Sequence, residues 1–115
     1  MKTKIGGQAV WEGVIMKNSY NDIIKDLNSG HIKEIVFSVK DYAHYHNCVI
    51  SFKEDFISSY SKIARIECKL VKDDSETVSF IPPFNEEYKL FRLGRKGSYS
   101  LKQIWNRVQI KQINY

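Results

Sequence analysis

The chain has 115 residues, 43% of them hydrophobic and 13% aromatic, which fits one globular domain and excludes a disordered chain. No apolar run approaches the roughly 20 residues that a membrane-spanning helix needs, so we expect no membrane span. The net charge of +5 is uneven, because residues 88–115 hold seven basic residues and no Asp or Glu. Gln8 and Glu12 interrupt the apolar N-terminal stretch that an export signal would need. With only two cysteines, the sequence then favours a cytoplasmic protein.

The first element that the sequence predicts is a helix after residue 19. Ser19 supplies a capping hydroxyl, and Tyr20, Ile23, Ile24 and Leu27 recur at helical spacing. Asn28-Ser29-Gly30 is typical of a helix end. We therefore expect residues 1–15 to form a peripheral N-terminal arm and residues 16–115 to form a single α+β domain.

The rest of the chain alternates short apolar segments with polar turns. Strands are predicted at 32–40, 48–53, 64–70, 77–81, 88–93 and 109–113, and the segment 54–61 fits either a short helix or an ordered connection. Ser100 and Gln103 form a capping box, which predicts a second helix from Leu101 to Arg107. The predicted fold is α+β, a single domain with a mostly antiparallel sheet of five to six strands and two helices packed on one face.

The basic C-terminal segment is the main functional signal, because cations are interleaved with aromatic residues. Cations neutralise phosphates, and flat side chains stack on the bases of single strands. The sequence therefore favours a non-catalytic protein that engages an acidic macromolecule, nucleic acid slightly ahead of an acidic protein. A protein–protein inhibitor or immunity-type module is the alternative, and a purely solvated basic face remains open. The predicted binding residues are Arg92, Arg95, Lys96, Tyr99, Lys102, Arg107 and Lys111.

A zinc-binding protein or enzyme is a further hypothesis. His44, His46 and Cys48 are spaced two apart, which would align three potential zinc ligands on one face of a strand. Real structural zinc sites usually add a second clustered pair of ligands, which this segment lacks. No arrangement typical of a nucleophilic or acid–base enzyme occurs. We therefore expect no cofactor and leave the metal site as an alternative.

One segment resembles a known family. Residues 6–17 read GGQAVWEGVIMK and resemble the glycine-rich start of YqhQ-type bacterial membrane proteins. The residues that match that start are Gly6, Gly7, Gln8, Ala9, Val10, Glu12, Gly13, Val14 and Met16. The resemblance implies a bacterial source. It covers about a tenth of the chain and implies no functional site, because the membrane spans that follow in that family have no counterpart here.

Overall fold

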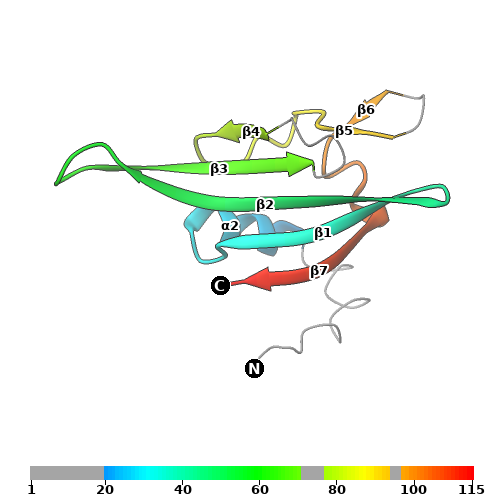
Figure 1. The fold of residues 1–115 in the computed structure, drawn as a ribbon, viewed down its shortest axis with the longest axis horizontal. Coiled ribbons are helices and arrows are strands. Elements are labelled where there is room, and N and C mark those ends of the chain that lie inside the picture. Colours follow the sequence, from blue (N-terminus) through cyan, green and yellow to red (C-terminus); the bar gives the residue numbers. More distant parts are fainter. Residues whose placement is uncertain (1–19, 71–76, 94–96) are drawn as a thin grey trace.

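The computed structural model describes residues 20–70, 77–93 and 97–115. They form a five-stranded antiparallel sheet, one α-helix and a separate two-stranded sheet, shown in Figure 1. The expected N-terminal arm, residues 1–15, lies outside the described residues. The large sheet has the order β4-β3-β2-β1-β7. The bounds are α2 Tyr20–Ser29, β1 Glu34–Asp41, β2 His44–Phe56, β3 Lys62–Leu70, β4 Thr77–Phe80, β5 Phe91–Arg92, β6 Ser98–Tyr99, a 3-10 helix η3 at Trp105–Arg107, and β7 Val108–Asn114.

Helix α2 covers one face of the large sheet with the stripe that its sequence predicts. Ile23, Ile24 and Leu27 are buried and join the core of the sheet. The helix ends at Gly30, which has a φ of 84° and donates its N–H to the carbonyl oxygen of Leu27 at 3.2 Å. The predicted capping residue, Ser19, lies outside the described residues.

Strands β1 to β4 follow one another as an antiparallel meander. Strand β1 buries Ile35, Phe37 and Val39 on the face that α2 covers, in the alternation that the sequence predicts. Strand β2 is much longer than the expected segment 48–53, with 13 residues, and its register with β3 continues to the pair Phe56 and Lys62. The two strands therefore extend beyond the body of the domain as a long hairpin, seen at the left of Figure 1.

Strand β7 closes the other side of the sheet by pairing with β1. Val39 is opposite Val108 and Phe37 is opposite Ile110, but the next partner of β1 is Gln112. This shift leaves Lys111 as the extra residue of a β-bulge. The C-terminal segment thus returns to a strand that lies about seventy residues earlier in the chain.

The expected α+β fold with two helices is wrong. Among the described residues, seven strands and a single α-helix are present. The capping box does form, since Gln103 donates its backbone N–H to Ser100 Oγ at 3.3 Å and Ser100 donates to Gln103 Oε1 at 2.9 Å. Only turns and η3 follow it, because β7 begins at Val108. So few residues cannot offset the cost of nucleating an α-helix.

The predicted strand at 88–93 is also shorter than expected. Only Phe91 and Arg92 pair, with Tyr99 and Ser98 of β6, and this two-stranded sheet is separate from the large one. Phe91 contacts Phe37 of β1 with ring centroids 6.2 Å apart, so the small sheet packs on the same core as α2. No helix within the described ranges is long and apolar enough to cross a membrane.

Candidate functional site

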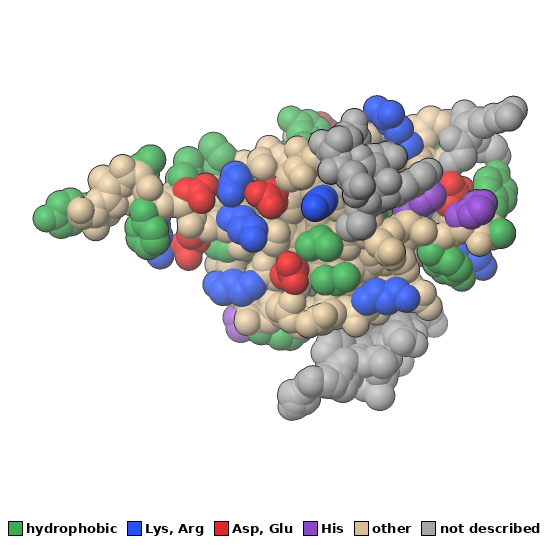
Figure 2. Space-filling model, in the orientation of Figure 1, with side chains coloured by type: hydrophobic (Ala, Val, Ile, Leu, Met, Phe, Trp, Pro, Cys, Tyr) green, Lys and Arg blue, Asp and Glu red, His purple; other side chains and the backbone are tan. Residues whose placement is uncertain are grey.

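The most unusual surface feature is the end of the β2–β3 hairpin. Phe56, Ile57 and Tyr60 expose 77%, 72% and 98% of their surface, and Ile63 is also exposed. We call residues 56–63 the hairpin tip. Figure 2 shows its hydrophobic side chains projecting from one end of the molecule, away from the core. Exposed apolar side chains that gather at one place are typical of interaction sites.

The hairpin tip is held in shape by its own hydrogen bonds. Ile57 and Ser58 donate their N–H groups to the carbonyl oxygen of Ser61, at 3.0 and 3.2 Å, and Ser61 donates back to the Ser58 carbonyl at 3.4 Å. Tyr60 N–H donates to Ser58 Oγ at 3.2 Å. The exposed side chains are therefore presented by an ordered turn, which reduces the entropy lost on binding.

Charges along the hairpin pair with one another. Lys62 Nζ lies 3.0 Å from Glu54 Oε2, on the opposite strand. Arg65 lies 3.4 Å from Asp55 Oδ2 and 3.3 Å from Glu67 Oε2. The stem below the hairpin tip thus carries both signs in close contact, so it gives little net attraction to a polyanion.

The seven residues predicted to form a basic binding surface lie on several parts of the molecule. Arg95 and Lys96 are outside the described residues. Arg92 is exposed on β5, whereas Tyr99 on β6 is half-buried against the core and is poorly placed for stacking. Lys102, Arg107 and Lys111 are exposed, on the turn after Ser100, on η3 and on β7. Figure 1 shows β5 and β6 beyond one border of the large sheet and β7 at the opposite border.

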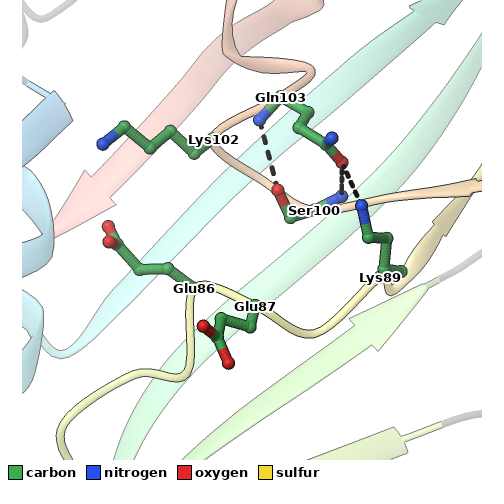
Figure 3. A pocket seen from close by; sticks show the side chains of 6 residues that line it. All are labelled: Glu86, Glu87, Lys89, Ser100, Lys102 and Gln103. Carbon is green, nitrogen blue, oxygen red and sulfur yellow. Dashed lines mark hydrogen bonds between the residues drawn. The ribbon is translucent and has the colours of Figure 1, made fainter.

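Lys102 lies in a hollow of mixed charge. Figure 3 shows this open hollow, of about 430 Å³, with Glu86 and Glu87 on the side opposite Lys102 and Gln103. Lys89 donates from Nζ to Gln103 Oε1 at 3.2 Å. Two carboxylates beside two ammonium groups make this hollow unsuitable for a nucleic-acid backbone.

The three proposed zinc ligands do not assemble. His44, His46 and Cys48 do share a face of β2, but Cys48 is buried in the core and His44 is exposed. His46 Nε2 instead lies 3.1 Å from Asp41 Oδ2. Within the described ranges, no group of three or more His, Cys, Asp or Glu side chains could hold a metal ion.

Both thiols are buried and free. Burial raises the pKa of Cys48 to about 12, and burial with the nearby Cys48 raises the pKa of Cys68 to about 12. A thiol with so high a pKa supplies almost no thiolate at neutral pH, so neither cysteine is suited to nucleophilic chemistry.

The sequence does not predict the hairpin tip, because Phe56, Ile57 and Tyr60 fit a short helix or an ordered connection. The available signal was the pattern of opposite charges, since Glu54 with Lys62 and Asp55 with Arg65 fit the cross-strand pairs of a hairpin that continues past residue 53. No protein-family model, curated protein or solved structure matches this chain.

Proposed function

We propose that this chain is a protein-binding module that inserts its hairpin tip into an apolar pocket of a partner protein. The observation that carries the proposal is the near-complete exposure of Tyr60 beside Phe56 and Ile57, on a turn that hydrogen bonds already order. The proposal shares only its class, a protein–protein module, with the alternative of the sequence analysis, in which a basic face would cover an acidic site on the target.

The exposed side chains are large enough to anchor a complex. A Phe or Tyr side chain buries about 150–250 Å² when covered, which gives an upper limit of about 4–6 kcal/mol at about 25 cal/mol per Å². Truncating such an anchor in an interface typically costs about 2 kcal/mol or more, which is a loss of about 30-fold in affinity. Phe56 and Tyr60 are the expected anchors, with Ile57 packing beside them.

The paired charges of the β2–β3 hairpin indicate which kind of partner surface it can bind. Lys62 and Arg65 are engaged by Glu54, Asp55 and Glu67. With the exposed Lys53, residues 53–67 hold three basic and three acidic residues, so the hairpin offers no net charge to a strongly acidic or basic surface. We therefore expect a pocket that is apolar with a rim of mixed charge. Binding should change little with salt, because screening acts mainly on unbalanced charges.

The test compares variants of the tip with a matched control. Partners are captured with the wild-type chain, with Phe56→Ser and Tyr60→Ser, and with Ile81→Ser, which removes an apolar side chain that is 68% exposed elsewhere. We expect one protein that the Ile81→Ser chain retains and both tip variants lose. The purified pair should form a complex whose Kd changes less than about threefold between 50 and 300 mM salt.

Three results would contradict the proposal. Equal capture by the tip variants and the wild type would show that the tip is not the binding site. Self-association of the wild-type chain that Tyr60→Ser abolishes would assign the tip to a second copy. Binding of neutral phospholipid vesicles with the same dependence on Tyr60 would assign it to a membrane surface.

A further inference from the structure

The opposite end of β2 carries a second group of exposed aromatic residues. Tyr42 and Tyr45 expose 71% and 56% of their surface at the turn from β1 to β2. Tyr42 adopts a left-handed conformation with a φ of 56°, which few residues other than Gly, Asn and Asp adopt. Figure 2 shows hydrophobic and histidine side chains together at this end, with Lys or Arg side chains close to them and an Asp or Glu side chain between the histidines.

The sheet register brings cations to these tyrosines. Lys40 is directly opposite Tyr45, on the sheet face that points away from the core. Val39 of β1 pairs with Val108, the first residue of β7. Arg107 directly precedes β7, so β1 lies between Arg107 and Tyr45 of β2. Lys111 lies farther along β7, as the extra residue of the bulge. All are exposed, and we call Lys40, Tyr42, Tyr45, Arg107 and Lys111 the tyrosine–lysine surface.

Acidic residues are scarce around this surface. Strand β7 contains no Asp or Glu, and neither does β2 before Glu54. Strand β1 carries two carboxylates. That of Asp41 is buried and lies 3.1 Å from His46 on the opposite face of the sheet. That of Glu34 accepts a hydrogen bond from Asn114 Nδ2 at 2.8 Å, at the far end of β7. The cations are therefore not neutralised in the way that those of the β2–β3 hairpin are.

We infer that the tyrosine–lysine surface binds single-stranded nucleic acid. Lys40, Arg107 and Lys111 would neutralise backbone phosphates, and the exposed phenol rings of Tyr42 and Tyr45 would stack on unpaired bases. Exposed flat rings favour a single strand over an acidic protein or a duplex, whose bases are already stacked. This inference keeps two of the seven residues expected from the sequence, Arg107 and Lys111, and replaces the half-buried Tyr99 as the stacking residue.

The salt dependence of binding measures how many cations take part. Fluorescence anisotropy of labelled oligo(dT) and oligo(U) of 20 nucleotides is recorded with the full chain between 50 and 200 mM salt. Three phosphate contacts predict a slope of about −2 for log Kobs against log salt, because each contact on a single strand contributes about −0.7. Lys111→Gln should make the slope shallower by about 0.7, and Lys25→Gln, an exposed lysine on α2, should leave it unchanged.

Stacking is tested at Tyr45. Tyr45→Ala should weaken binding about 5- to 100-fold, and Tyr45→Phe, which keeps the ring, should retain it. Equal effects of Lys25→Gln and Lys111→Gln would overturn the inference, as would no binding of either oligonucleotide. Tighter binding of a duplex that Tyr45→Ala does not change would assign the surface to duplex backbones, and an acidic polypeptide that competes at equal charge would assign it to a protein. Tyr60→Ser should bind oligonucleotides normally, so this inference and the proposed function can fail separately.

Discussion

Gly30 allows a direct test of how α2 joins the sheet. Its φ of 84° is left-handed, and a Cβ at this position would meet Phe52 Cε1 at 3.0 Å and Cζ at 3.1 Å. The backbones on both sides of this contact are held, because Phe52 N–H donates to the Lys33 carbonyl at 2.8 Å and Lys33 Nζ donates to the Gly30 carbonyl at 2.7 Å. The contact can therefore be relieved only by moving the Phe52 ring, which is partly buried against the core. The left-handed backbone costs about 1–2 kcal/mol for alanine, and the close contact adds about 1 kcal/mol. The reduced entropy of the unfolded chain returns about 0.4–1 kcal/mol.

We therefore expect Gly30→Ala to lower the free energy of unfolding by about 2 kcal/mol and Tm by about 8 °C. Urea unfolding followed by circular dichroism measures the first, and a double-mutant cycle with Phe52→Leu separates the contact from the backbone effect. The cycle should give a coupling of about 1 kcal/mol. Gly97→Ala is the matched control, since its φ is 102° but nothing lies within 4 Å of the added Cβ. A coupling below about 0.3 kcal/mol would refute the proposed contact with Phe52.

Two further predictions concern the core and the C-terminal turn. The thiols of Cys48 and Cys68 have a pKa of 9.0 in the unfolded chain, and burial raises the pKa of both to about 12 in the folded protein. The unfolded chain therefore loses these protons first, so the free energy of unfolding should fall as pH rises above 9. The expected loss is about 1 kcal/mol per thiol between pH 9 and pH 10. Urea unfolding at pH 8, 9 and 10 measures this dependence. Cys48→Ala should make the free energy of unfolding fall less steeply with pH, and an equally steep fall in this variant would contradict the prediction. Ser100→Ala removes the acceptor for Gln103 N–H and should cost about 1 kcal/mol by the same assay, with Ser79→Ala on the exposed side of β4 as the control. A loss no greater than that of the control would show that the capping box adds nothing to stability.

The elements that depend on local patterns could be predicted from the sequence. Ile23, Ile24 and Leu27 form a stripe that only a helix can bury on one side, and Ile35, Phe37 and Val39 alternate as a half-buried strand requires. In both cases the buried residues lie within one turn or a few residues of each other. No information from distant parts of the chain was needed.

The second helix could not be excluded from local patterns. Ser100 and Gln103 make the predicted capping box, and the local sequence gives no stop before Val108. The segment ends early because Val108 pairs with Val39 of β1, far away in the sequence. Such a pairing overrides a local helix signal, and it is not visible in the segment itself.

The candidate site was hidden for a related reason. Phe56, Ile57 and Tyr60 are apolar, so the sequence favours burying them, and their exposure depends on how far β2 and β3 extend beyond α2. The basic residues were grouped because they are close in sequence, but Lys102 and Lys111 lie on different elements of the fold. Basic residues that are close together in the sequence therefore need not be close together on the surface.

We propose that the hairpin tip enters a pocket of a partner protein. Site-specific photo-crosslinking tests it most directly, with a benzophenone amino acid in place of Tyr60 and, as the matched position, in place of Ile81. We predict one dominant crosslinked protein from position 60, lost when Phe56→Ser is added, and no such product from position 81. The same products from both positions, or products from position 60 that Phe56→Ser leaves unchanged, would contradict the claim.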